Sequence, residues 1–513
     1  MVQQLNHNRR IAKNTIILYF RMLFIMGISL YTSRVVLNML GVEDYGVYNV
    51  VGGTVTLLGV LSSSLSTASL RFLTFELGRN NYTALQRIFS LSFTIHLGLA
   101  LVVLLVAELA GVWFLNTHLN IPAERLYTAN WVFQCSVLSF FVTMLGIPFD
   151  ALMIAHERMT AFAYIGILDV LLKFMLIWGL AHFAFLSDKL LVYGVILMFV
   201  TMLTQFIYVY YCRKHFLECR CSLTWDKVRL REMADFAGWS FIGSCALVLR
   251  DQGVNILLNI FCGPIVNAAR GISYSVNNAM SSFVGNFMVA LNPQITKYYA
   301  AGEWENVGLL VKRGSRFSFY ILLILTLPVL FETDFILSMW LNKYPNYTVV
   351  FVRLLLVLSL VDSLSNTLNT LQLATGRIQN YQLAVGGLTL LNCPFSYLLL
   401  WLGYEPEITV IVAIFLSFVC LLVRLLFLHR TTGFSIQNYL GEVVRNVILV
   451  STCTLPFPWL IYHMMPASTL RFVALTAGCI LWTSSIVYKI GCCTSEKIFL
   501  RQRCAVVWKR ISN

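Results

Sequence analysis

Long apolar runs alternate with short polar segments along the whole chain. An α-helix needs about 20 residues to cross the hydrocarbon core of a bilayer. Runs of that length lie at Asn14–Leu40, Tyr45–Phe72, Ile88–Leu115, Arg125–Phe149, Thr160–Phe183, Leu190–Cys212, Phe236–Cys262, Val266–Lys297, Phe317–Leu341, Tyr347–Leu373, Tyr381–Leu402, Ile408–His429, Val443–His463 and Leu470–Ile490. We therefore predict an all-α integral membrane protein with about fourteen transmembrane helices.

The composition supports this prediction. Of the 513 residues, 58% are hydrophobic and 12% are charged, whereas a soluble protein carries about 25% charged residues because its surface faces water. The formal net charge of +14 would suit a nucleic-acid-binding protein. The basic residues, however, lie in short segments between apolar runs, as they do in membrane proteins. We therefore expect membrane lipids, and no nucleic acid, as partners.

The basic residues also predict the orientation of the chain, because Lys and Arg accumulate on the cytoplasmic side. With the N-terminus inside, most of them fall in cytoplasmic segments, such as Arg213–Arg231 and the tail after Lys497. The outer loops then hold only Arg125, Lys189, Lys343 and Arg471. We expect a multi-pass protein of the bacterial inner membrane with both termini in the cytoplasm.

Three short segments recur about 220 residues further on, in the same order, as in an internal repeat. One of them, Leu37–Gly41, matches Leu258–Gly263. An offset of six spans preserves helix direction, so we predict two six-helix lobes related by a pseudo-two-fold axis along the membrane normal. The predicted parts are an N-lobe over 1–212, a cytoplasmic linker over 213–235, a C-lobe over 236–429, two further helices within 430–490 and a basic cytoplasmic tail over 491–513.

The second and eighth spans are the most polar in their halves and occupy corresponding positions in the repeat. In transporters built from repeats, the substrate site lies at the interface of the lobes. We therefore expect these spans to line a cavity there, although small polar residues also pack helices together. The candidates are Ser63, Ser66, Asn277, Asn278 and Ser281.

Ionisable residues within spans are costly and therefore indicate function. Arg250 lies near the middle of span seven, as a candidate anion binder or as the partner of Asp251 or Asp362. Adjacent helical residues point about 100° apart, so we expect Arg250 and Asp251 not to share a face. Further candidate cations for the cavity are Arg21, Arg34 and Arg270.

Other charged residues have simpler interpretations. Asp169 and Lys173 are spaced i, i+4 and are expected to form an ion pair. Arg353 and Arg424 lie near span ends and are expected to snorkel toward the interface. The carboxylates that could couple transport to H⁺ or Na⁺ are Asp169, Asp251 and Asp362. We expect no other cofactor and no metal site.

The stretch Ser33–Gly46 resembles the start of polysaccharide-biosynthesis flippases, the Wzx type of O-antigen and capsule flippase within the MATE-like MOP superfamily. The shared feature is the Leu-Gly-x-x-Asp-Tyr-Gly turn between spans one and two. The resemblance implies a plan of 12 + 2 helices and an undecaprenyl-diphosphate-linked oligosaccharide as substrate. It also implies cavity arginines on early and on seventh or eighth spans, which Arg21, Arg34, Arg250 and Arg270 would supply.

We therefore expect a flippase for surface polysaccharide, working by alternating access, with a polysaccharide polymerase and a chain-length regulator as possible partners. The nearest alternative is an ion-coupled multidrug exporter of the same superfamily, which would favour intramembrane carboxylates. A membrane-embedded polymerase or glycosyltransferase is a third reading. The chain lacks a nucleotide motif and a sizeable catalytic loop, so we expect no enzyme.

Overall fold

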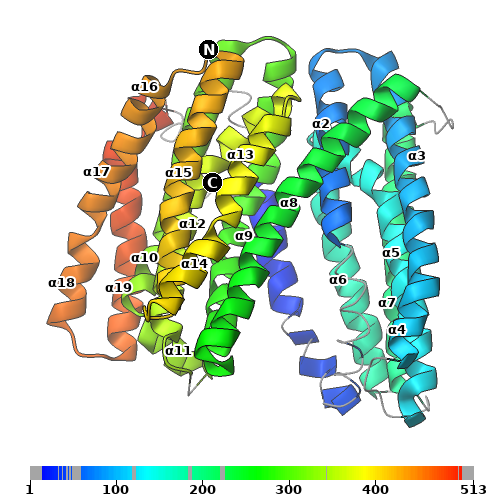
Figure 1. Ribbon diagram of the computed structural model, residues 1–513, viewed down its shortest axis with the longest axis horizontal. Helices are drawn as coiled ribbons and strands as arrows, with labels where there is room; N and C mark the ends of the chain where they lie inside the picture. The colour runs from blue at the N-terminus through cyan, green and yellow to red at the C-terminus, as the bar shows by residue number, and fades with distance from the viewer. Residues whose placement is uncertain are drawn as a thin grey trace, which may run out of the picture. The chain divides into compact units, whose positions relative to one another are not determined.

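The computed structural model describes residues 14–117 except 30, 33, 37, 42–43, 45–47 and 49–58, then 123–182, 188–219, 226–341, 344–494 and 496–498. All secondary structure in these ranges is helical (Figure 1). The basic residues Arg9 and Arg10, most of the basic tail and part of the Leu-Gly-x-x-Asp-Tyr-Gly turn lie outside the described residues.

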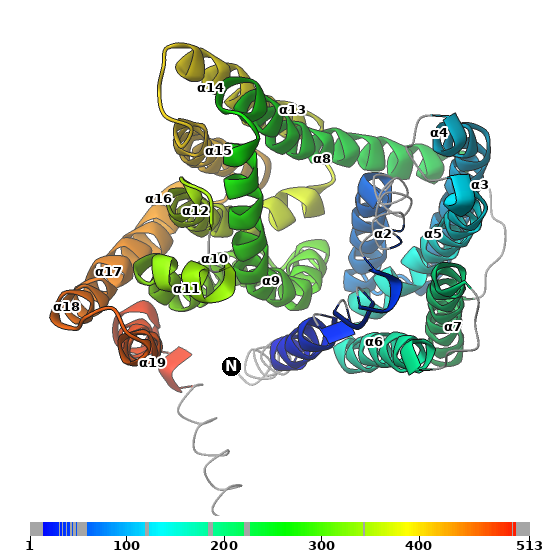
Figure 2. The same cartoon turned by 90° about the horizontal axis from the view of Figure 1, so that it is seen from below.

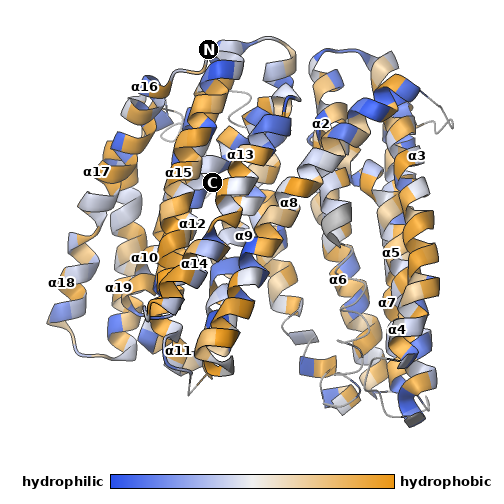
Figure 3. Ribbon diagram, in the orientation of Figure 1, coloured by the Kyte–Doolittle hydropathy of each residue, from blue (hydrophilic) through white to orange (hydrophobic). Residues whose placement is uncertain are grey.

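Twelve helices in the described part of the chain are long and apolar enough to cross a membrane. The first is Asn14–Gly41. The two predicted spans absent from the twelve are the polar ones: α2 (Gly59–Gly78) and α9 (Pro264–Ala300) are both helical but carry many Ser and Asn residues. The prediction of an all-α, multi-pass membrane protein is therefore confirmed. Figure 3 shows apolar residues along most of α3 and α15.

The chain divides into two compact units, residues 11–244 and 245–513, which we call the N-terminal and C-terminal units. The division falls inside α8 (Lys227–Cys262). Besides the first helix and α2, the N-terminal unit contains α3 (Tyr82–Val106), α4 (Val112–Thr117), α5 (Leu126–Ala155), α6 (Met159–His182) and α7 (Lys189–His215). Its largest core joins α3, α5 and α7 around Phe89, Phe149 and Tyr208.

The C-terminal unit contains the second part of α8 and α9, together with the ten helices that follow. These are α10 (Trp304–Phe331), α11 (Thr333–Leu341), α12 (Thr348–Thr375), α13 (Gln379–Leu390), α14 (Asn392–Trp401), α15 (Ile408–Thr432), α16 (Ile436–Tyr439), α17 (Arg445–Thr454), α18 (Pro456–Met464) and α19 (Thr469–Ile486). Helix α12 is central: it packs on α9, α10 and α15. Its buried Phe351 and Leu355 form one core with Leu258 of α8 and Val410 of α15.

Prolines interrupt two of the predicted spans. Proline has no N–H, and its ring clashes with the carbonyl four residues earlier. The span that includes Pro456 and Pro458 breaks between α17 and α18. Span eleven, predicted as continuous over Tyr381–Leu402, instead divides into α13 and α14 at Leu391, three residues before Pro394.

Helices α17 to α19 pack on α10 (Figure 2), and buried ion pairs fix both ends of this group. At one end Arg471 donates to both carboxylate oxygens of Glu332, over 2.6 and 2.9 Å. Glu332 is 1% exposed. At the other end Arg316 of α10 donates to Glu496 over 2.9 Å, and Arg313 lies 3.0 Å from the same carboxylate. The last two spans are therefore a fixed part of the C-terminal unit.

We predict that Glu332→Gln will destabilise the protein strongly. Removing one member of a buried ion pair leaves the other charge unpaired and costs about 3–5 kcal/mol. The matched control is Asp235→Asn, because Asp235 pairs with Arg231 on the surface, where the side chains are 67% and 85% exposed and such a pair contributes less than about 1 kcal/mol. Thermal unfolding in detergent measures both variants, and equal midpoints would contradict the prediction.

Candidate functional site

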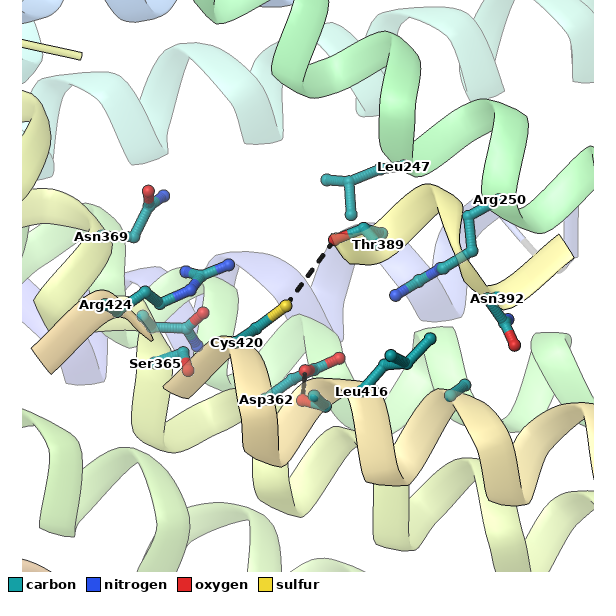
Figure 4. A pocket seen from close by; sticks show the side chains of 13 residues that line it. Leu247, Arg250, Asp362, Ser365, Asn369, Thr389, Asn392, Leu416, Cys420 and Arg424 are labelled. Carbon is teal, nitrogen blue, oxygen red and sulfur yellow. Dashed lines mark hydrogen bonds between the residues drawn. The ribbon is translucent and has the colours of Figure 1, made fainter. Parts of the chain in front are cut away.

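A cavity of about 290 Å³ lies within the C-terminal unit (Figure 4). One wall is a polar face of α12. Asp362, Asn366 and Asn369 follow one another at intervals of four and three residues, so they lie on the same side of the helix. Ser365 belongs to the same wall. The buried Phe351, Leu355 and Leu358 of the core continue the same spacing toward the start of α12, so the cavity and the core follow one another along one face of the helix.

Helix α15 forms the second wall. Ser417, Cys420 and Arg424 are again spaced by three and four residues and line the cavity. Ser417 donates a hydrogen bond to Asp362 across the two helices. The guanidinium carbon of Arg424 lies 5.9 Å from the ring centroid of Tyr381, within the range of a cation–π contact. Arg424 is thus part of the cavity wall, and the expectation that it snorkels toward the interface stays a prediction.

The break between α13 and α14 supplies the third wall. Thr389 ends one helix and Asn392 begins the next, and both line the cavity. Interrupted helices are a common way to place polar groups at a transport site. The hydroxyl of Thr389 lies 4.0 Å from the sulfur of Cys420. Pro394 therefore shapes the site, because it ends the regular hydrogen bonding of span eleven at this point.

Arg250 reaches the cavity from α8 (Figure 4). It precedes the end of α8 by twelve residues, which corresponds to about 18 Å along the axis. Its Nε donates to Oδ1 of Asp251 over 2.9 Å, so the expectation that these neighbours do not meet is wrong. The arginine side chain is long enough to bend back along the helix. This bond uses Nε and leaves the two terminal nitrogens of Arg250 without a hydrogen-bond partner among the described residues.

Arg270 lies beside this pair, but both of its terminal nitrogens donate to groups of the protein. It is 3% exposed. Its Nη1 donates to Asn255 over 2.9 Å and its Nη2 to the hydroxyl of Tyr274 over 3.1 Å. Tyr274 in turn donates to Oδ1 of Asp251 over 3.2 Å. Hydrogen bonds thus join Arg270, Tyr274 and Asp251 in one network. Asp251 in turn accepts the bond from Nε of Arg250.

The polar candidates on α9 lie against α12. Ser359 of α12 donates to Oδ1 of Asn277 over 2.7 Å and accepts from Ser281 over 3.3 Å. Asn278 is exposed. Farther along, Thr370 donates to Asn292 over 2.8 Å. These bonds join the two helices, as expected of small polar residues that pack helices. The predicted role of Asn277, Asn278 and Ser281 in lining a cavity between the lobes stays a prediction.

None of the candidates in the N-terminal unit belongs to the lining of this cavity. Arg21 lies 4.4 Å over the ring of Phe162. Asp169 forms the predicted ion pair with Lys173, over 2.8 Å. Arg34 and Ser63 are exposed, and Ser66 is half-buried. A cavity role for these residues also stays a prediction.

A carboxylate that sequence reasoning missed lies near Arg21. Asp150 of α5 interacts electrostatically with this arginine. Its Oδ1 is buried and accepts no hydrogen bond from the described residues. The signal in the sequence was a single acid directly after the predicted span Arg125–Phe149, six residues before the polar His156–Arg158 link. The N-terminal unit therefore has a charged cluster of its own.

The electrostatics of the C-terminal cavity are net positive. In and beside the cavity, three guanidinium groups, those of Arg250, Arg270 and Arg424, outnumber the two carboxylates of Asp251 and Asp362, and Ser417 donates to Asp362. Figure 4 shows Arg250 and Arg424 directed into the hollow from different sides. The remaining polar groups are amides and hydroxyls, which suit sugar hydroxyls and phosphate oxygens. Of the residues predicted from sequence, Arg250 and Asp362 line this cavity.

We predict that Cys420 will report this polarity. The measurement uses a variant in which the other cysteines are replaced, and compares the rates at which an anionic and a cationic methanethiosulfonate modify Cys420. The ratio of the anionic to the cationic rate should be higher for Cys420 than for free mercaptoethanol. One nearby positive charge that lowers the approach energy by about 1.4 kcal/mol gives a tenfold ratio. The ratio should fall in Arg250→Gln and Arg424→Gln. A preference for the cationic reagent would contradict the assignment of charge.

Comparison with known proteins identifies the fold. No family model and no curated protein matches this chain. Among solved structures, it is similar to a "multidrug resistance MATE family transporter of the MOP superfamily" in an outward-facing conformation, with a TM-score of 0.72, 11% identity and coverage of 84% of this chain and 97% of the other. The transporter ClbM, solved with Rb⁺, matches with a TM-score of 0.67 and 13% identity over 81% of this chain and 94% of its own.

A third similar structure is a MOP superfamily transporter from Pyrococcus furiosus, with a TM-score of 0.66 and 11% identity over 81% of this chain and 94% of that one. Its description states that a reverse polarity of the binding pocket suggests a different function. The chain described here thus has the MATE/MOP transporter fold.

Proposed function

We propose that this protein is a flippase that moves an undecaprenyl-diphosphate-linked oligosaccharide across the inner membrane for surface-polysaccharide synthesis. The observation that supports it most is the cavity with two arginines and one carboxylate. Arginine suits a diphosphate because its planar fork donates paired hydrogen bonds. The free terminal nitrogens of Arg250 are such a fork, and Asp251 holds it at Nε.

The size of the cavity limits which part of the substrate it holds. A volume of about 290 Å³ lies at the lower end of small-ligand pockets, which span about 300–1,000 Å³. We therefore assign the cavity to the diphosphate and the first sugar. Asn366, Asn369 and Asn392 are the amides that would bind sugar hydroxyls. The rest of the glycan and the lipid tail would lie outside it.

The polarity of the pocket also bears on the closest alternative, an ion-coupled multidrug exporter. Most of the similar solved structures are MATE transporters, and this fold is compatible with drug export. Cationic drugs, however, bind poorly beside a cluster in which three arginines outnumber two carboxylates. For the P. furiosus transporter of this fold, a reverse polarity of the binding pocket is likewise described as suggesting a different function. A net positive cavity favours an anionic substrate here.

Energy for transport would come from an ion gradient or from removal of the product, because the chain has no ATP-binding motif. Asp362 is the coupling carboxylate that lies in the cavity, next to Ser417 and within electrostatic reach of Arg250. Loss of its charge on binding a proton would free Arg250 and Arg424 to hold the diphosphate more tightly. We propose H⁺ as the coupling ion on this ground, with Asp169 as the candidate in the N-terminal unit.

We predict that Arg250→Ala and Arg424→Ala will each reduce export of surface polysaccharide at least about tenfold, because one charge-assisted bond to the substrate contributes about 1.5–3 kcal/mol. Arg250→Lys keeps the charge but loses the fork and should restore export only in part. The matched control is Arg231→Ala, which removes an arginine that is 85% exposed. A strain lacking the native gene, complemented with each variant, measures surface glycan and the accumulated lipid-linked intermediate.

Normal surface polysaccharide in cells that produce membrane-inserted Arg250→Ala would overturn the proposed function. Tolerance to cationic dyes, measured in the same strains, distinguishes a flippase from a multidrug exporter. A flippase should confer none, whereas an exporter should confer a tolerance that survives removal of the arginines.

A further inference from the structure

A second hollow, of about 430 Å³, lies within the N-terminal unit. It is found where four spans end: α5 ends at Ala155, α6 begins at Met159, α7 ends at His215 and α3 begins at Tyr82. Its lining includes Tyr82, Gln86, His156, Arg158, Phe216 and Glu218. This position is the level of the lipid headgroups, because helix ends emerge from the hydrocarbon core there.

The hollow contains a buried anion. Glu218 is 7% exposed, and its Oε1 lies 3.5 Å from Nε2 of His156. Within the described residues this imidazole is the only basic group at ion-pair distance from Glu218. The adjacent His156 imidazole lowers the pKa of the Glu218 carboxyl, so Glu218 is ionised at neutral pH. No hydrogen bond joins the described Nε2 of His156 to this carboxylate, which leaves its oxygens able to accept from a ligand.

Aromatic rings line the same hollow as the carboxylate. The His156 ring stacks on Phe216, with centroids 4.3 Å apart and planes at 16°. Tyr82 lies in the same lining and is 59% exposed. A carboxylate beside aromatic faces is a favourable seat for an ammonium group, because the ring faces attract cations as well.

A cation that is not paired with Glu218 lies in the same lining. Arg158 is exposed, and its side chain has no ion pair or hydrogen bond with any residue that the structure describes. His215 is near it, with its ring stacked on Tyr211 at 4.2 Å. The hollow therefore presents separate negative and positive groups. A ligand that carries both a phosphate and an ammonium would satisfy them together.

The rim of the hollow is apolar. Leu217 belongs to the lining and is 81% exposed, although it lies just beyond the end of α7. A leucine at the headgroup level is stabilised when an acyl chain or the glycerol region of a lipid covers it. The ligand is thus expected to be amphipathic as well as zwitterionic.

We propose that this hollow binds the headgroup of an aminophospholipid, with the ammonium at Glu218 and the phosphate at Arg158. A primary ammonium donates N–H bonds to the carboxylate, which the quaternary ammonium of phosphatidylcholine cannot do. Phosphatidylglycerol offers no cation to Glu218. The site is independent of the flippase function and would link the stability of the N-terminal unit to the lipid composition of the membrane.

The test measures thermal unfolding of the purified full chain in detergent, with added phosphatidylethanolamine, phosphatidylglycerol or phosphatidylcholine of equal acyl chains. We expect phosphatidylethanolamine to raise the unfolding midpoint most. Glu218→Gln should weaken its apparent affinity at least about tenfold, since an ionic hydrogen bond is lost. The matched control, Glu232→Gln, changes an exposed acid at the start of α8 and should keep the full effect.

Arg158→Gln provides a second variant in case Glu218→Gln does not fold, because Arg158 is exposed and its replacement leaves the core intact. It should weaken the effect of phosphatidylethanolamine and of phosphatidylglycerol alike. Native mass spectrometry would count the lipid molecules retained by each variant. Equal or stronger stabilisation by phosphatidylglycerol, or an undiminished effect of phosphatidylethanolamine on Glu218→Gln or on Arg158→Gln, would overturn the proposal.

Discussion

A guanidinium group inside a bilayer must be hydrated, paired or bound to an anion, because an isolated charge there costs several kcal/mol or more. The C-terminal unit carries two such groups in the lining of one cavity, Arg250 of α8 and Arg424 of α15. Arg250 is paired only through Nε, and the Nε of Arg424 has no hydrogen-bond partner in the described structure. This requirement explains why the helices around them leave a polar cavity and do not close into a dry core.

The fold meets the requirement with three features of ordinary helices. Polar residues at intervals of three and four give α12 and α15 one polar stretch each, and residues nearer the start of both helices continue the same faces into the apolar core. Pro394 breaks span eleven and turns Thr389 and Asn392 to the same space. The ion pairs of Arg471 with Glu332 and of Arg316 with Glu496 fix the last helices on α10. Together these features hold the helices around the charged cavity in place.

The sequence predicts the spans well, because hydropathy and length alone decide whether a segment can cross a bilayer. It also predicts the Asp169–Lys173 pair, which follows from helix geometry. It does not predict contacts that depend on how a long side chain bends or on how separate helices pack. Arg250 bends back to Asp251 despite the angle between their Cβ directions, and depth alone did not show which way Arg424 faces. Thr389 and Asn392 escaped notice because their placement depends on a helix break within an apolar run.

The central claim is that the cavity of the C-terminal unit binds a diphosphate. Equilibrium binding of undecaprenyl diphosphate to the purified protein tests it most directly, with tetraphenylphosphonium as a competing cation. The account predicts saturable binding that the cation does not displace and that disappears in the double variant Arg250→Gln/Arg424→Gln. Binding of tetraphenylphosphonium in place of the diphosphate, or diphosphate binding that persists without both arginines, would contradict it.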